Sequence, residues 1–438
     1  MERTNTILQR LYVGLLLVVF GGIVLHAPLS VAFSSLFPEY SLIIKSWKEI
    51  LMGVALLVGV VLLTTKKQWQ LVLRSKTLLY MGLFAVLHLL MLAMYYQGAQ
   101  PTLAGLMIDL RFFLFFALVY VALTLFPQYY GMFLKVFVVG VLVVIGFSVL
   151  QVTVLPHDIL KYLGYNETTI MPFLTVDQNM AYVRINGTLR GPNPLGLYAM
   201  ISLVAALALL LRRPARLKRW MYWLVGLVLV GSLMALWYSY ARSAALAAGV
   251  AVLVVLGVCY GRKLSKWVWL SVAVGCLMLA GGLYVAKDTT FVSQVLLHED
   301  PNEGGEVNSN DGHARSLVNG TRLMLQQPLG AGVGSTGSAS LLGEKPMIIE
   351  NQYLLVAHEV GWVGLALFIL IQWRVLASVW RRRQGWLALG VFASGIGVVV
   401  AGMVLPALVD DTVAIVWWGL AAMVVALPVV AVGSKKGI

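Results

Sequence analysis

The chain has 438 residues, of which 60% are hydrophobic and only 11% are charged. Soluble globular proteins carry roughly 25% charged residues, so this composition excludes an ordinary soluble domain. Apolar stretches of about 20 residues, the length that crosses a hydrocarbon core, recur along the whole sequence. A membrane β-barrel would instead show short segments of alternating hydrophobicity. We therefore expect an all-α polytopic membrane protein that forms a single integral membrane domain over residues 1–438.

Taken in chain order, the apolar stretches predict about twelve transmembrane helices. The first is too long for a cleavable signal peptide and lacks a small-residue cleavage site, so we expect it to stay in the protein. The predicted spans are residues 11–33, 47–65, 77–96, 104–126, 131–154, 195–211, 219–239, 243–260, 267–286, 351–373, 386–408 and 412–433.

The distribution of Lys and Arg predicts how these helices are oriented. Alternate connections are basic, among them "KKQWQLVLRSK", "RRPARLKR" and "RVLASVWRRRQ", whereas the other connections hold nearly all the acidic residues. Because basic connections stay in the cytoplasm, both termini are expected there. The net charge of +14 then reflects topology and attraction to anionic membrane lipids. It does not imply binding to nucleic acid.

Two long connections, residues 155–194 and 287–350, are expected on the extracytoplasmic side. Loops of this length in a compact protein are commonly functional. Both contain apolar residues, so we expect ordered caps that carry short helices. The segment "GHARSLVNGTRLMLQQ" has helical periodicity that ends before Pro328. Because the cytoplasmic connections are short, any chemistry is expected on the outer side.

The sequence offers no motif for a cofactor or a metal. It contains no GxxxxGK[ST] phosphate-binding motif, and "GAGVGS" lies in a loop outside any βαβ unit. Cys259 and Cys276 lie within predicted spans without CxxC spacing, and HxxxH and HExxH are absent. We therefore expect neither a cytosolic nucleotide as reactant nor a metal site.

Charged residues near the ends of spans are costly in a membrane unless they are paired or line a wet cavity. Glu49 opens the second span, either as a helix-start carboxylate favoured by the helix dipole or as the partner of a cavity arginine. Asp109 and Arg111 are two residues apart and cannot face each other, so each is expected to pair with another helix. The other polar residues of the spans are expected to cap helices or lie satisfied in the core: Asp410, Asp411, His26 and His88.

Two arginines at predicted outer helix ends indicate an anion site. Arg190 precedes the sixth span in "LRGPNPLG", where Pro192 and Pro194 predict a non-helical approach and Asn193 can cap the helix. Arg242 lies in the tight turn "YSYARSAA". Each could anchor the chain at the interface by snorkelling. Because arginine is the preferred bidentate partner of phosphate oxygens, we favour a lipid phosphate or diphosphate as ligand.

These motifs, in this order, resemble the O-antigen ligase and O-antigen polymerase superfamily. The resemblance rests on "RGPNPLG", "ARSA", a long loop with "GH" and "PLGAGVG", and "ENQYLLVAHEVGWVGLALFIL", and it spans Glu49 to Gly364. The family pattern is His, then Asn, Ser or Gln, nine residues, Gly, two residues, and Gly, Thr or Tyr. Here Glu350, Asn351, Gly361 and Gly364 fit every position except the first.

The resemblance implies a metal-independent, inverting glycosyltransferase with a GT-C-like fold in the bacterial inner membrane. Its donor would be a glycan on undecaprenyl diphosphate, and its acceptor a hydroxyl of a glycan or of a lipid-linked acceptor. Such a protein would act in surface polysaccharide biosynthesis. The reaction needs a base for the hydroxyl proton and positive charge for the diphosphate.

The resemblance also implies roles for individual residues. Glu350 occupies the place of the ligases' catalytic histidine and is the candidate base; otherwise it is a neighbour of a helix N-cap. Arg190 and Arg242 match the family's diphosphate-binding arginines, and Arg315 is a candidate third. Supporting roles are expected for four further residues: Asn351, which would orient Glu350 or the sugar, His313, Glu49 and His358.

Three functions remain open from the sequence. A polymerase would join lipid-linked repeat units, whereas a ligase would move a finished glycan to a lipid, a protein or a cell-wall acceptor. A secondary transporter or lipid-linked glycan flippase would also use intramembrane charges. It would carry Gly- or Pro-broken spans at matching positions of two repeats, and the sequence shows no such pair.

Overall fold

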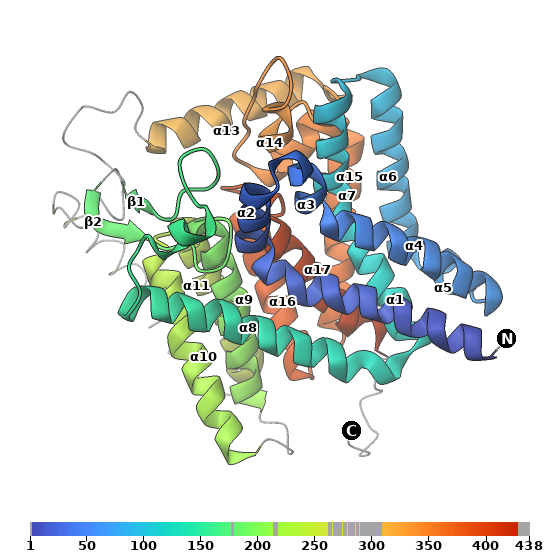
Figure 1. Ribbon diagram of the computed structural model, residues 1–438, viewed down its shortest axis with the longest axis horizontal. Coiled ribbons are helices and arrows are strands. Elements are labelled where there is room, and N and C mark those ends of the chain that lie inside the picture. The colour runs from blue at the N-terminus through green and yellow to red at the C-terminus, as the bar shows by residue number, and fades with distance from the viewer. Residues whose placement is uncertain are drawn as a thin grey trace.

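The computed structural model describes residues 2–176, 179–212, 218–261 and 309–427, together with single positions between 262 and 308. This part of the chain is mostly helical (Figure 1). Within it, nine helices are long and apolar enough to cross a membrane, and two shorter apolar helices lie near the C-terminal end. The architecture is therefore that of a polytopic α-helical membrane protein.

Eleven of the predicted spans coincide with apolar helices. The remaining one, residues 267–286, falls outside the described residues apart from isolated positions. The first predicted span comprises α1 (Glu2–Gly22), a 3-10 turn (Ile23–Leu25) and α2 (His26–Leu36). The others are α4 (Trp47–Thr65), α6 (Lys76–Met94), α7 (Ala99–Leu125), α8 (Tyr130–Thr153), α9 (Pro192–Arg212), α10 (Arg219–Tyr238), α11 (Arg242–Tyr260), α15 (Gln352–Trp380), α16 (Trp386–Gly402) and α17 (Asp411–Ala426). Two short helices, α3 (Ser41–Lys45) and α5 (Gln70–Leu73), lie between them.

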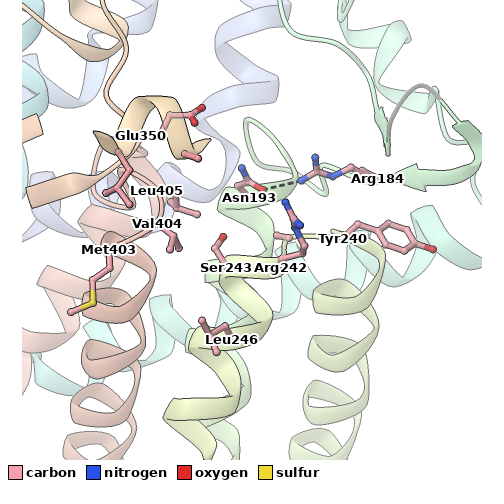
Figure 2. Close-up of a pocket in the computed structure, with 13 residues that line it drawn as sticks. Arg184, Asn193, Tyr240, Arg242, Ser243, Leu246, Glu350, Met403, Val404 and Leu405 are labelled. Carbon is pink, nitrogen blue, oxygen red and sulfur yellow. Dashed lines mark hydrogen bonds between the residues drawn. The ribbon is translucent and has the colours of Figure 1, made fainter. Parts of the chain in front are cut away.

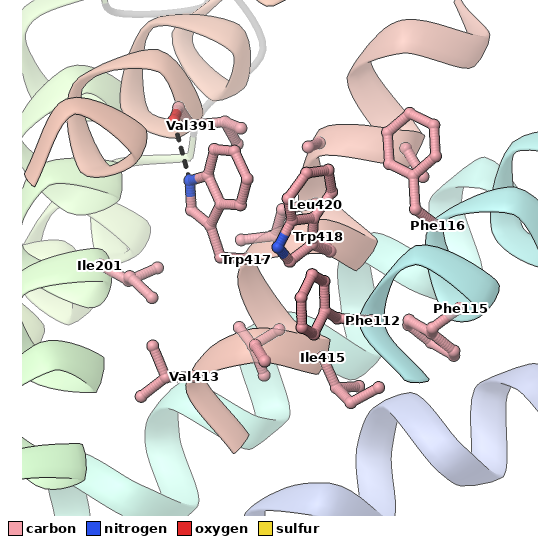
Figure 3. Close-up of a cluster of buried hydrophobic side chains, with 14 of the residues drawn as sticks. Phe112, Phe115, Phe116, Ile201, Val391, Val413, Ile415, Trp417, Trp418 and Leu420 are labelled. Atoms are coloured by element: carbon pink, nitrogen blue, oxygen red, sulfur yellow. Dashed lines mark hydrogen bonds between the residues drawn. The ribbon is translucent and has the colours of Figure 1, made fainter. Parts of the chain in front are cut away.

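The centre of the molecule is built around α17, which packs against α7, α9 and α16. Trp418 of α17 is fully buried and lies beside Phe112 (Figure 3). Its ring centroid is 5.5 Å from that of Phe112 and 4.9 Å from that of Phe113. The indole N–H of Trp417 donates to the carbonyl of Val391 on α16 at 3.2 Å. Lipid tails are as apolar as leucine, so close van der Waals packing of this kind, rather than exclusion from water, holds membrane helices together.

Helices at the periphery are apolar on their exposed faces. On α10, Trp220, Trp223 and Leu227 are more than half exposed, which is unfavourable in water but suits contact with lipid. Inside, small residues permit close approach: a Cβ on Gly390 of α16 would lie 3.0 Å from the Cα of Ala205 on α9. Close contact of small residues is typical of membrane helix interfaces.

The 155–194 connection differs from the prediction of short helices alone. It contains one 3-10 turn (Ile159–Leu163) and an antiparallel hairpin of β1 (Leu174–Val176) and β2 (Asn179–Arg184). The paired segments "LTV" and "AYVR" hold β-branched and aromatic residues, which fit a pleated surface better than a helix. The backbone N–H of Ile185, next to β2, donates to the carbonyl of Tyr238 at the end of α10. The hairpin is thereby attached to the helices.

The second long connection contains the predicted helix. It is α13 (Ser309–Gln326), which ends before Pro328 as the periodicity indicated. A short helix, α14 (Gly337–Ser340), follows. Both lie at one end of the bundle beside the start of α15 (Figure 1), and α13 packs directly against α15.

Candidate active site

Two adjoining cavities lie between the start of α9, the α10–α11 turn, the start of α15 and the segment after α16. The first, of about 480 Å³, is lined by Arg184, Tyr240 and Arg242 among others. The second, of about 330 Å³, is lined by Arg190 and Asp410 among others. The two cavities share three lining residues: Asn193, Glu350 and Leu405. Glu350 therefore borders both.

A sharp turn between two helices places Arg242 at the first cavity. Helix α10 ends at Tyr238, Tyr240 takes a left-handed conformation with φ of +47°, and Arg242 begins α11. The hydroxyl of Ser239 accepts a hydrogen bond from the N–H of Ala241 at 3.3 Å, which holds the turn. Burial, with a smaller contribution from Tyr238, raises the pKa of Tyr240, so its phenol stays neutral at the cavity wall.

Arg190 reaches the second cavity from just before α9. The expected non-helical approach through both prolines is wrong, because α9 already begins at Pro192. Proline is well tolerated in the first turn, where its missing N–H needs no partner. Asn193 does not cap the helix from outside, since it lies in this first turn, and its Oδ1 accepts from Nη2 of Arg184 at 2.8 Å.

Glu350 directly precedes the N-cap of α15. The cap is Asn351, whose Oδ1 accepts from the N–H groups of Tyr353 at 2.9 Å and Leu354 at 3.0 Å. Its Nδ2 donates to the carbonyl of Met403, after α16. The N–H of Glu350 donates to Oγ of Ser316 on α13 at 2.9 Å. Asn351 thus fixes the backbone beside Glu350, and Glu350 is held between α13 and the end of α16 (Figure 2).

Helix α15 is broken shortly after this start. Gly361 has φ of +69° and ψ of −172°, a conformation that is nearly exclusive to glycine. A Cβ at this position would lie 2.5 Å from the carbonyl oxygen of Pro328. Gly361 therefore forms the break in α15 and is not a contact point between two helices. Gly364 does lie close to α6, where its Cβ would approach Leu87 to 3.3 Å.

The "GAGVGS" segment fills this break and binds a carboxylate of the same chain. The N–H groups of Ala331 and Gly332 donate to the carbonyls of His358 and Glu359 at 2.6 and 3.1 Å. Oε1 of Glu359 accepts from the N–H groups of Gly334 at 3.1 Å and Thr336 at 3.4 Å. Two backbone N–H groups of the loop thus converge on one carboxyl oxygen. The glycine-rich segment therefore anchors α15, a role that its sequence did not reveal.

The other charged residues of the spans form a separate cluster. Asp411 pairs with Lys48 at 2.7 Å, with His26 at 3.2 Å and with Arg111. Glu49 lies 3.2 Å from Lys48 and 3.9 Å from Arg111. We call these five residues the buried charge cluster. One alternative predicted Glu49 as the partner of a cavity arginine. Glu49 does pair with an arginine, Arg111, but Arg111 lines neither cavity.

Asp109 and Arg111 pair with other helices, as expected. His88 of α6 approaches Asp109 with its Nε2 3.4 Å from Oδ2, and Arg111 pairs with α17. Asp410 caps α17 as expected, with its Oδ1 accepting from the N–H of Val413 at 3.0 Å. Asp411, in contrast, belongs to the buried charge cluster.

The remaining predicted site residues lie apart from the cavities or cannot be placed. Arg315 is exposed on α13 and is not among the lining residues, although Ala314 beside it is. His358 is buried in α15. The side chain of His313 lies outside the described residues.

Arg184, at the end of β2, was not singled out from the sequence, yet it lines the first cavity together with Arg242. One signal was available: Arg184 is another arginine in a predicted outward connection, six residues before Arg190 in "RINGTLR". Like Arg242, it is predicted on the outer side, whereas most basic residues lie in cytoplasmic connections.

Comparison with known proteins supports the interpretation of the sequence motifs. A search of curated proteins finds no match. Residues 227–369 match the family model described as "O-Antigen ligase". This segment holds Arg242, the second long connection, Glu350 and the broken start of α15. This match supports the resemblance to the O-antigen ligase and O-antigen polymerase superfamily that the motifs indicate.

Proposed function

We propose that this protein transfers a glycan from a polyprenyl diphosphate, in bacteria undecaprenyl diphosphate, to an acceptor hydroxyl at the extracytoplasmic face of the inner membrane. The observation that carries the proposal is the position of Glu350. It borders both cavities, with Arg242 at the first and Arg190 at the second. The candidate base therefore borders the same cavities as two groups able to hold a diphosphate.

The arginines would bind the donor. Arg242 and Arg190 lie on either side of Asn193, which both cavities share, and guanidinium groups bind phosphate oxygens bidentately. The positive charge also stabilises the negative charge that develops on the leaving diphosphate.

An apolar side of the first cavity would accommodate the prenyl chain. Leu246 on α11 and Met403 and Val404 after α16 line this cavity and are also substantially exposed. These residues belong both to the cavity lining and to the exposed surface of α11 and of the segment after α16. A hydrocarbon tail on this surface would remain in contact with lipid.

Glu350 would act as the general base. It removes the proton of the acceptor hydroxyl while that oxygen forms a bond to the anomeric carbon from the face opposite the diphosphate. The bond between the anomeric carbon and the diphosphate oxygen breaks, and the diphosphate leaves with the electron pair. The anomeric configuration is inverted, and Glu350 afterwards releases its proton to water. Diphosphate is a good leaving group, so no strong general acid is needed.

Purified protein in lipid nanodiscs with lipid-linked repeat units tests the proposal. Glycan transfer is expected with the natural chain, and its absence with every lipid-linked donor would refute the proposal. A ladder of product lengths identifies a polymerase. A single transfer to a different lipid, protein or cell-wall acceptor identifies a ligase.

The break in α15 argues against the alternative of a transporter. In transporters, the carbonyls at broken helices coordinate ions or substrate. Here the carbonyls of His358 and Glu359 accept hydrogen bonds from Ala331 and Gly332, and the N–H of Trp362 donates to Pro328. The break is thus filled by the chain itself. Flux of lipid-linked glycan across liposomes without transfer would favour the transporter instead.

A further inference from the structure

We propose that Arg184 is a diphosphate-binding residue that acts together with Arg242 in the first cavity. This proposal rests on the proposed function and deepens it. It assigns to the hairpin of the 155–194 connection the third guanidinium that was expected from Arg315 on α13. Arg315 is not among the residues that line the cavities, whereas Arg184 is.

The two guanidinium groups reach the first cavity from different elements. Arg184 ends β2, and Arg242 begins α11. Figure 2 shows both side chains directed toward Asn193, with Glu350 across the cavity from them. Two positive charges that face the same space raise its affinity for an anion.

Arg184 is held in place by groups that also form the site. Its Nε donates to the carbonyl of Ser239, in the turn that presents Arg242, at 3.0 Å. Its Nη2 donates to Oδ1 of Asn193, which borders both cavities, at 2.8 Å. A guanidinium carries five N–H donors in a fixed plane, so these bonds orient the group without preventing donation to a ligand. A donor fixed in this way loses little conformational entropy when it binds.

The chemistry of the cavity favours a diphosphate on a lipid over a simple phosphate. Arg184 and Arg242 can each take one phosphate group in bidentate contact. The exposed apolar residues Leu246 and Met403 continue the same cavity toward the surface. A prenyl diphosphate gives each guanidinium a phosphate group of its own, whereas the two guanidinium groups would have to share the single group of a prenyl monophosphate.

Binding of farnesyl diphosphate and of farnesyl monophosphate to the full chain in nanodiscs tests the proposal. The variants are Arg184→Gln, Arg184→Lys and, as a matched control, Arg322→Gln on the exposed face of α13. Gln keeps a donor for Asn193 or Ser239 but removes the charge. We expect Arg184→Gln to weaken farnesyl diphosphate binding about 10-fold or more, Arg184→Lys to weaken it less, and Arg322→Gln to leave it unchanged. Monophosphate binding should fall less than diphosphate binding.

The outcomes separate the proposals. If Arg184→Gln binds the diphosphate as well as the natural chain does, Arg184 only ties the hairpin to the helices, and this inference fails alone. If the natural chain binds neither compound, the proposed function fails as well. Should Arg184→Gln not fold, Arg184→Lys decides, because it preserves the charge but loses the bidentate geometry. Equal affinity of Arg184→Lys for both compounds would support the proposal, and an unchanged preference for the diphosphate would contradict it.

Discussion

The cavities and the buried charge cluster use the same residue types in opposite ways. In the cluster, Lys48 and Arg111 pair directly with Glu49 and Asp411, and the four side chains are at most 17% exposed. At the cavities, Arg190, Arg242 and Glu350 line open space. Charge that is enclosed and balanced holds helices α4, α7 and α17 in register, whereas charge around a cavity can act on a ligand. Surroundings, and not residue type, therefore distinguish structure from function here.

The sharpest way to test this comparison is to neutralise Glu350. Glu350→Gln should lower the rate of glycan transfer by about 10²–10⁴-fold, the usual contribution of a general base, while farnesyl diphosphate binding and the melting temperature stay unchanged. Initial rates with a lipid-linked donor measure this. Glu344→Gln, on the same connection and exposed, is the control and should transfer at the natural rate. Full activity of Glu350→Gln would remove Glu350 as the base.

Neutralising a charge in the buried charge cluster should lower stability and leave glycan transfer unchanged. Arg111→Gln leaves Asp411 without its arginine partner, and breaking a buried ion pair from one side costs about 3–5 kcal/mol. Unfolding in denaturing detergent, followed by tryptophan fluorescence, should show this loss. Transfer per folded molecule should persist. If instead Arg111→Gln abolished transfer without loss of stability, the division between the two regions would be wrong.

A smaller effect is expected at the break that supports the cavity wall. Gly361→Ala forces a side chain into a conformation that costs about 1–3 kcal/mol and pushes against the carbonyl of Pro328. The melting temperature should fall, and transfer should fall with it, because α15 carries Glu350 at its start. Gly53→Ala on α4, where nothing lies within 4 Å of the new Cβ, is the control and should be neutral. Equal melting temperatures for the two variants would contradict a structural role of the break.

The smallest effect is expected at Asp410, which caps α17 and also lines the second cavity. Asp410→Ala should cost about 1 kcal/mol of stability, the usual value of an N-cap. Asp410→Asn should retain the cap. If transfer is lost in both variants although Asp410→Asn keeps the natural melting temperature, Asp410 belongs to the site as well as to the helix. The thermal shift and the transfer rate, measured side by side, distinguish these roles.

Much of the helical framework could be predicted because lipid imposes a simple rule on sequence. Each span must be apolar for about 20 residues, and this pattern located the starts of most of the long apolar helices within a few residues, although α15 runs well past its predicted end. The local backbone structure between and within these helices was harder to predict. Pro192 and Pro194 predict a non-helical approach, although the first turn of a helix tolerates proline, and a hairpin forms where the sequence predicts short helices. Gly361 fitted a motif, but the sequence did not show that it breaks α15.

The candidate site was partly readable for a related reason. Arg190, Arg242 and Glu350 were singled out one by one, because charge near the end of an apolar segment is costly and needs an explanation. The residues that lie next to those charges in space could not be predicted from the sequence. Arg184 and Arg242 line the same cavity although they are 58 positions apart in the sequence. Glu49 pairs with Arg111, which is 62 positions away. Such meetings depend on which helices pack together.

By itself, then, the sequence determined the class of the protein, the positions of most spans and the individual residues with costly charges, because hydropathy and charge are local properties. Only the tertiary structure decided which charges neutralise one another in the buried charge cluster and which gather around the two cavities. The physical reason is that the energy of a charge depends on its neighbours in space and on the medium between them. In this chain the packing of α4, α7 and α17 provides those neighbours for one group of charges. The α9 start, the α10–α11 turn, the hairpin and the start of α15 enclose the other.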